Sequence, residues 1–174
     1  MADNDFTKAA IGFLSVVDDS AHGLFGGYLI LNPAGRPVEF HCTSPVKPNR
    51  AQEILYGNTL KPYLYGEQIA RTLIEKSKIM PRTVCFDQSC ALCVRSLIEI
   101  PAILVENCKN GETTENIGED RILWNGKQIL SALPEYLEDI PTLRQVLKEL
   151  VIEFDFMEPF ERIRSAIREA QKGA

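Results

Sequence analysis

The order of apolar and polar positions divides the start of the chain into strand-like segments. Residues 11–17, "IGFLSVV", form an apolar run of strand length that ends at two adjacent aspartates, Asp18 and Asp19. Residues 27–31 and 37–43 are predicted to form a β-hairpin, because the Asn-Pro-Ala-Gly between them has the composition of a type I turn. Apolar and polar residues alternate in the second hairpin strand, as a half-buried strand requires. We therefore expect an antiparallel β-meander at the start of the fold.

Helical spacing replaces the strand pattern from residue 50 onward. Residues 50–56 and 59–78 are predicted to be two helical pieces, because a Gly-Asn pair between them favours a helix end. Residues 82–87, 89–100 and 101–107 then read as strand, helix and strand, a unit that joins parallel strands by a right-handed crossover. The meander and this unit together predict a single α/β domain with a mixed sheet.

The second half of the chain begins with a polar segment and ends in helices. A hairpin is predicted around Asn125 and Gly126, which stand between apolar pairs. An apolar stripe over residues 143–151 and a second one that starts near Pro159 predict a helical C-terminal extension. We therefore divide the chain into an α/β core at residues 1–108, a polar loop at 109–121, and a hairpin with helices packing on the core at 122–174.

Composition and charge favour a folded cytoplasmic protein. The chain has 174 residues, of which 45% are hydrophobic and 25% charged, as expected of one folded domain. Its net charge is -5 and it contains no basic run, so nucleic acid is not favoured as a partner. No apolar segment approaches the ~20 residues that cross a bilayer, and the N-terminus lacks the pattern of a signal peptide. The sequence thus predicts a cytoplasmic location and no membrane partner.

Three of the five cysteines lie close together in the sequence. Cys85, Cys90 and Cys93 have the spacing C-x4-C-x2-C, and the Cys90–Cys93 pair stands at the start of a predicted helix, as in thiol-redox proteins. Small buried core thiols are the favoured interpretation, because free cysteine is among the most buried residue types. Zinc binding is a third interpretation of these cysteines, and a zinc ion needs a fourth ligand beside them. The donors for it are His41, Cys42 and Cys108.

The glycines of "GLFGG" are interpreted as a turn between strands. Gly23, Gly26 and Gly27 precede a strand rather than a helix, and no Lys-Ser/Thr follows them, so a phosphate-binding loop is not supported. A tight turn that needs positive φ is the favoured interpretation.

The element order of residues 11–108 resembles the ribonuclease H-like fold, and three short strings resemble it too. These strings are "VVDDSAHGLFGGYLIL", "PNRAQEIL" and "TVCFDQS". The resemblance implies that Asp18, Glu53 and Asp87 hold divalent metal, with Asp19 able to replace Asp18. Two Mg²⁺ ions on oxygen ligands stabilise both the attacking and the leaving oxygen of phosphodiester cleavage.

The carboxylate set that the resemblance implies is incomplete in the sequence. Gln52 stands where the family has its glutamate, and no motif selects Asp155 or Glu158 as the acid of the last helix. We therefore expect a non-catalytic interaction or assembly protein, without a cofactor, that binds a protein partner or a second copy of itself. A Mg²⁺-dependent ribonuclease H-like nuclease is the alternative, and a thiol-redox protein that uses Cys90 and Cys93 is a second alternative.

Overall fold

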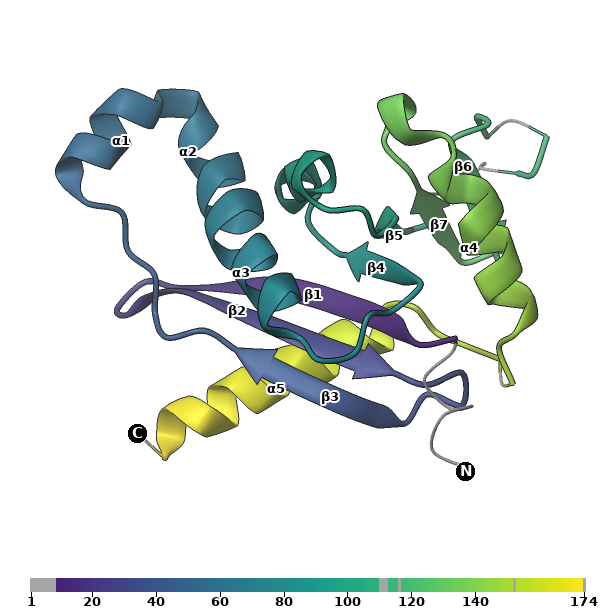
Figure 1. The fold of residues 1–174 in the computed structure, drawn as a ribbon, viewed down its shortest axis with the longest axis horizontal. Coiled ribbons are helices and arrows are strands. Elements are labelled where there is room, and N and C mark those ends of the chain that lie inside the picture. The colour runs from purple at the N-terminus through teal and green to yellow at the C-terminus, as the bar shows by residue number, and fades with distance from the viewer. Residues whose placement is uncertain (1–8, 110–112, 116, 152, 174) are drawn as a thin grey trace.

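The computed structural model describes residues 9–109, 113–115, 117–151 and 153–173 and shows one mixed sheet of seven strands (Figure 1). The strand order is β3-β2-β1-β4-β5-β7-β6. β1, β2 and β3 are antiparallel, β4 and β5 run parallel to β1, β7 is antiparallel to β5, and β6 is antiparallel to β7. The strands are β1 (Ile11–Asp19), β2 (Gly23–Leu31), β3 (Pro37–Cys42), β4 (Thr83–Phe86), β5 (Ala102–Asn107), β6 (Arg121–Trp124) and β7 (Gln128–Ser131).

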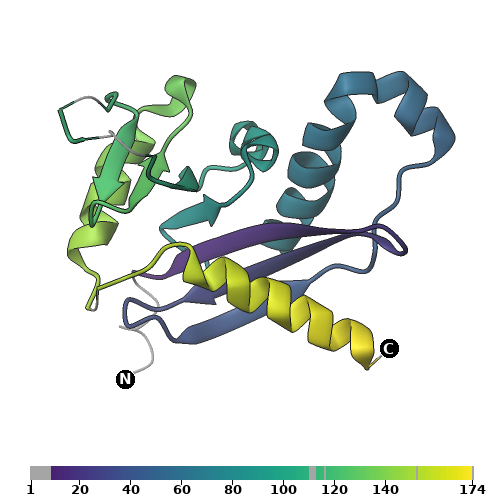
Figure 2. The same cartoon turned by 180° about the vertical axis from the view of Figure 1, so that it is seen from behind.

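Helices cover both faces of the sheet. One face carries a helical arm that changes from α-helix to 3₁₀- and π-helix along its length, and the opposite face carries the long C-terminal helix, which Figure 2 shows lying across β1 to β3. The arm consists of α1 (Arg50–Tyr56), η2 (Gly57–Thr59), α2 (Leu60–Pro62), η3 (Tyr63–Ala70) and α3 (Arg71–Lys76). The remaining helices are η4 (Ser89–Leu97), η5 (Pro134–Tyr136), α4 (Asp139–Lys148) and α5 (Glu158–Lys172).

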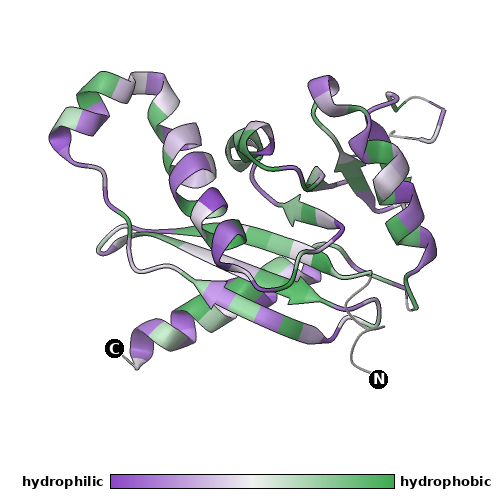
Figure 3. Cartoon of the chain, in the orientation of Figure 1, coloured by the Kyte–Doolittle hydropathy of each residue, from purple (hydrophilic) through white to green (hydrophobic). Residues whose placement is uncertain are grey.

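Side chains of alternate residues in β1 enter two separate hydrophobic cores. Phe13 packs with α4 and α5, whereas Leu14 and Val16 pack under η3, α3 and η4. This division follows from the strand period of two, since successive side chains point to opposite faces of a sheet. Figure 3 shows the consequence, with largely apolar colouring along β1 and β2 and mixed colouring along α5. β1, β2 and β4, in the middle of the sheet, are thus buried on both faces.

Two of the glycines that the sequence analysis placed in a turn lie inside β2. A Cβ on Gly26 would meet Ile69 Cγ2 at 2.2 Å, and a Cβ on Gly27 would meet Ile163 Cγ2 at 2.3 Å from the other side. β2 therefore begins at Gly23 and not at residue 27, and only Gly23, with φ of +106°, has the positive φ that was expected. The turn itself occupies residues 20–22. The interpretation of "GLFGG" as a turn is therefore wrong for Gly26 and Gly27, where close helix packing requires glycine.

The predicted fold class is confirmed by this architecture. The meander, the parallel strand-helix-strand unit and the hairpin with a positive φ at Asn125 and Gly126 are all present, and α4 and α5 form the helical C-terminal extension. Residues 110–112 and 116 of the predicted polar loop lie outside the described residues. None of the helices that the structure describes is long and apolar enough to cross a membrane.

Candidate functional site

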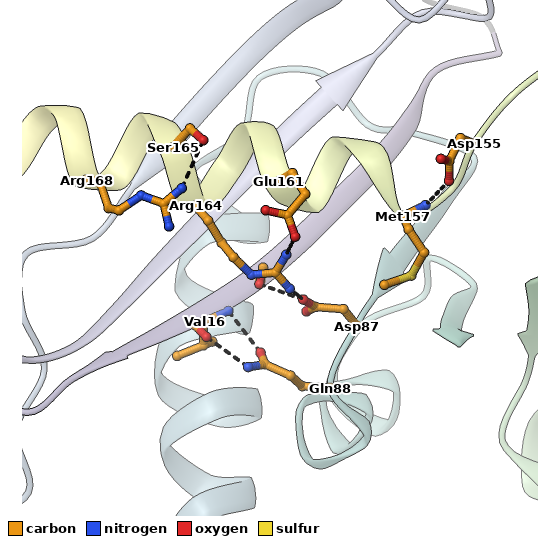
Figure 4. A network of polar contacts seen from close by, with 10 residues as sticks. Val16, Asp87, Gln88, Asp155, Met157, Glu161, Arg164, Ser165 and Arg168 are labelled. Carbon is orange, nitrogen blue, oxygen red and sulfur yellow. Dashed lines mark hydrogen bonds and ion pairs between the residues drawn. The ribbon is translucent and has the colours of Figure 1, made fainter. Parts of the chain in front are cut away.

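The carboxyl ends of β1 and β4 meet at one edge of the sheet, as expected of adjacent parallel strands. The last paired residues of the two strands are Leu14 and Phe86, so Ser15 comes to lie beside Asp87. The Ser15 hydroxyl donates a hydrogen bond to Asp87 Oδ2 at 3.0 Å. Gln88 continues the pairing with its side chain: Val16 N donates to Gln88 Oε1 at 3.0 Å, and Gln88 Nε2 donates to Val16 O at 2.8 Å (Figure 4). The two strand ends are thereby held together.

Asp87 is a buried carboxylate that receives a cation from α5. Its side chain is 4% exposed, and Arg164 Nη2 donates to its Oδ2 (Figure 4). The same guanidinium donates through Nη1 to Glu161 Oε1 at 2.6 Å. Asp87 Oδ1 is buried and has no hydrogen-bond partner among the residues that the structure describes. Burial raises the pKa of Asp87, although Arg164 and the Ser15 hydroxyl act in the opposite direction.

Asp18 lies on the opposite face of the sheet, at the mouth of an open pocket of about 490 Å³. The side chain is exposed, because β1 leaves the core at Val17. The pocket lies between the end of β1, the segment 46–48 and the helical arm. Lys47 Nζ donates to the backbone oxygen of Ala21 at 2.9 Å, and Lys61 Nζ stands 5.2 Å from the centre of the Tyr65 ring. The pocket is lined by Asp18, Gly23, Leu24, Val46, Lys47, Pro48, Gly57, Asn58, Leu60, Lys61, Leu64 and Tyr65.

Asp18 and the lysines give this pocket opposite charges close to a phenol. Burial raises the pKa of Tyr65, and the negative charge of Asp18 raises it further. A second open pocket of about 590 Å³ shares Val46 with the first and is lined by Glu67 and Lys76 among others. The two pockets adjoin at Val46, with Lys47 and Lys61 lining the first and Lys76 the second.

Asp19 and Glu53 are engaged in local contacts instead. Asp19 Oδ1 accepts hydrogen bonds from the backbone amides of Ala21 and His22, at 2.8 and 2.9 Å, and these bonds lower the pKa of the carboxyl. Glu53 lies exposed on α1, where Arg50 Nη1 donates to its Oε2 at 3.1 Å. Figures 1 and 2 both show α1 at the outer end of the arm, away from β4.

The donor set does not fit the divalent metal centre that the resemblance implies. Among residues 9–109, 113–115, 117–151 and 153–173, no group of three or more His, Cys, Asp or Glu side chains is placed to hold a metal ion. Asp87 offers the free Oδ1, but its neighbour across the strands is Ser15 and its Oδ2 holds Arg164. Asp18 faces the other side of the sheet. The two strand-end aspartates therefore do not converge in this arrangement.

The cysteine pair lacks the electrostatics of a redox site. Burial raises the pKa of Cys90 and also that of Cys93, whereas a reactive thiol needs a lowered pKa. Cys93 Sγ lies 3.2 Å from the backbone oxygen of Pro62, and a Cβ on Gly66 would meet Cys93 Sγ at 2.2 Å, so this thiol fills the space between η4 and η3. Cys85 is buried in the sheet. The favoured interpretation as packing thiols agrees with this environment.

Sequence comparison with models of protein families and with curated proteins finds no match. Comparison with solved structures finds endonuclease V of Ciona intestinalis, a D234N variant in complex with a 23mer DNA that contains an inosine followed by a ribo-adenosine. It has a TM-score of 0.53 at 15% identity, over 97% of this chain and 90% of that one. The catalytic domain of human endonuclease V matches with a TM-score of 0.52 at 14% identity, over 94% and 84% of the two chains. The chain has a ribonuclease H-like fold.

This likeness corrects two of the sequence predictions. The expectation of a non-catalytic interaction or assembly protein with a protein partner or a second copy is wrong, because the matching structures are endonucleases and favour the nuclease alternative. The expectation that nucleic acid is disfavoured is wrong as well, because the Ciona endonuclease is in complex with DNA. Net charge was a poor guide here, since it counts charges over the whole chain and says nothing of where lysines gather.

Sequence reasoning missed the residues that contact Asp87. Ser15 lay within a run read as a plain strand, and Arg164 lay on a helix read as a packing element. The sequence does contain a signal for Ser15, because it is a polar residue inside the otherwise apolar run of residues 11–17. Arg164 has no such signal, since its contact spans 77 residues of sequence.

Proposed function

We propose that this protein binds nucleic acid along the surface formed by the two open pockets, with Lys47 and Lys61 at the phosphates. The observation that supports the proposal is the pocket at the end of β1, where two lysines and a tyrosine stand beside Asp18. Its volume of about 490 Å³ is of the size that takes a small ligand group. The ribonuclease H-like fold, shared with an endonuclease that is in complex with DNA, supports the same proposal.

Lysines contribute to such binding as point charges that release counterions from the phosphate backbone. The Lys47 ammonium donates to the Ala21 carbonyl, and within the described part of the chain it forms no salt bridge with a carboxylate. Lys61 lies over the Tyr65 ring, a contact that involves no carboxylate. Both cations are therefore available to an anion, whereas Arg71 and Arg162 are each paired with a glutamate one helical turn away.

Fluorescence anisotropy with labelled single-stranded and duplex oligonucleotides, in the presence of a chelator, tests the proposal. We expect binding at low salt, and we expect each of Lys47→Ala and Lys61→Ala to lower the slope of log K against log salt by about 0.7–0.9. Lys127→Ala is the matched control, since Lys127 is an exposed lysine on the β6–β7 hairpin. The proposal is refuted if no oligonucleotide binds, or if the two variants behave as the control does.

Phosphodiester cleavage is the second candidate function, and the free Oδ1 of buried Asp87 is the observation that favours it. A carboxylate oxygen at a strand end is a ligand that Mg²⁺ accepts. The other predicted ligands are Asp18, Asp19 and Glu53. Within the described part of the chain they do not form a metal-binding group with Asp87. Incubating labelled strands with Mg²⁺ or Mn²⁺ tests this function: cleavage is expected to disappear in Asp87→Asn, and its persistence there would assign it to another site or to a contaminant. The cytoplasmic location stays a prediction from the sequence.

A further inference from the structure

Asp87 already forms an ion pair with a side chain of the protein itself, Arg164. Arg164 donates from one guanidinium nitrogen to Asp87 and from another to Glu161, so a single positive group bridges two carboxylates (Figure 4). The other side-chain contact of Asp87, with the Ser15 hydroxyl, is neutral. Asp87 is therefore paired with a cation of the chain itself, which it shares with Glu161.

A divalent ion bound to Asp87 would stand next to this guanidinium. Mg²⁺ binds a carboxylate oxygen at 2.0–2.1 Å and demands near-octahedral geometry. Arg164 is in hydrogen-bonding contact with the same carboxylate, and like charges at such separations repel strongly in a partly buried site. The ion and the guanidinium therefore compete for Asp87.

The backbone of Arg164 is fixed while its side chain is accessible. Its predecessor on α5, Ile163, is fully buried against the sheet, as is Ile167 one turn later. The Arg164 side chain itself is 29% exposed. The guanidinium can thus leave Asp87 by rotation of the side chain alone, without movement of the helix.

We propose that Arg164 is the resident cation of the strand-end site and that it keeps divalent metal away from Asp87. This inference rests on and deepens the second candidate function, phosphodiester cleavage, because it states what cleavage at Asp87 requires: Arg164 must leave Asp87 before an ion can bind. Ser15 supports it, since a hydroxyl stands where a metal centre would need a second carboxylate. Arg164 acts through Asp87 and is a positioning residue.

Titration with Mn²⁺, followed by the loss of the free-ion signal in electron paramagnetic resonance, tests the inference without nucleic acid. Arg164→Gln removes the charge and keeps a polar, although shorter, side chain. We expect it to bind Mn²⁺ at least tenfold more tightly than the unmodified protein, and we expect Asp87→Asn in the same chain to abolish that gain. Arg162→Gln is the control, because Arg162 lies on the same helix but pairs with Glu158.

The inference is overturned if the unmodified protein binds Mn²⁺ as tightly as Arg164→Gln does, or if the gain survives Asp87→Asn. It is also overturned if a folded Arg164→Gln shows no gain, since the site would then reject an ion for another reason. Arg164→Met, a neutral variant that keeps an unbranched stem, carries the same expectation if circular dichroism shows that Arg164→Gln does not fold. Nucleic-acid binding is measured with a chelator present, so failure here leaves the proposed function standing, and the reverse holds too.

Discussion

Gln88→Ala removes the two hydrogen bonds that fasten the end of β1 to the segment after β4. The Gln88 amide accepts from Val16 N and donates to Val16 O, and Val16 is 3% exposed. Each bond contributes about 1 kcal/mol net to stability, so we expect the free energy of unfolding to fall by about 2 kcal/mol. For a chain of this size the melting temperature then falls by about 4–8 °C. Urea denaturation followed by circular dichroism measures the first quantity directly.

Amide hydrogen exchange gives a local readout of the same change. Gly26, the residue of β2 that pairs with Val16, donates its amide to the Thr43 hydroxyl on the side away from β1. The Val16 amide correspondingly points away from β2 and donates to the Gln88 side chain, which protects it from exchange. We expect this amide to exchange faster in Gln88→Ala. Gln145→Ala, at an exposed position of α4, is the control and is expected to stay within ~0.5 kcal/mol. Equal stability of the two variants, or unchanged exchange at Val16, would show that Gln88 does not hold the strand ends.

Three further predictions concern ionisable side chains outside the candidate site. Burial alone raises the pKa of Glu39, but a neighbouring imidazole, two backbone amides and a hydroxyl bring it down to about 2, so its contribution is present above pH 4.5 and is lost as the pH falls toward 2. Acid titrations of stability in Glu39→Gln should lack this loss, which has a slope of up to about 1.4 kcal/mol per pH unit, and an unchanged slope argues against it. Asp139→Ala leaves Arg95 without its buried partner and is expected to cost ~3–5 kcal/mol in urea denaturation; a loss below ~1 kcal/mol contradicts this. With Ellman's reagent the exposed Cys42 should react well before Cys90, whose pKa is raised by burial, and a reversed order would refute that assignment.

The fold was accessible from the sequence because its signals are local. The type I turn before β3, the Asn-Gly hairpin and the strand-helix-strand unit each depend on residues within one short stretch of the sequence. Gly26 and Gly27 show where such reasoning ends. A glycine pair beside a polar segment indicates a turn, but here each glycine admits a side chain from a helix that lies far along the chain, Ile69 on one face and Ile163 on the other. Only the packed structure distinguishes these two reasons for glycine.

The candidate site was less accessible, because it depends on register and on the face of the sheet. The amino-acid sequence of β1 resembles the strand that carries the metal-binding aspartate of ribonuclease H-like proteins, with Asp18 in that place. The sequence does not say how β1 pairs with β4, and a shift of three residues in that pairing would leave the resemblance unchanged. The structure pairs Leu14 with Phe86, so Ser15 stands beside Asp87 and Asp18 lies three residues beyond it.

The pleat then separates the two aspartates, because three is an odd number and successive side chains point to opposite faces. Asp18 consequently lines the lysine pocket under the helical arm, whereas Asp87 turns to α5 and meets Arg164. The acid that looked most like a metal ligand thus lies on the surface proposed for nucleic acid, and the acid best placed to bind a metal already holds a guanidinium. Metal loading and nucleic-acid binding are therefore expected to respond to different mutations, Arg164 for the first and the two lysines for the second.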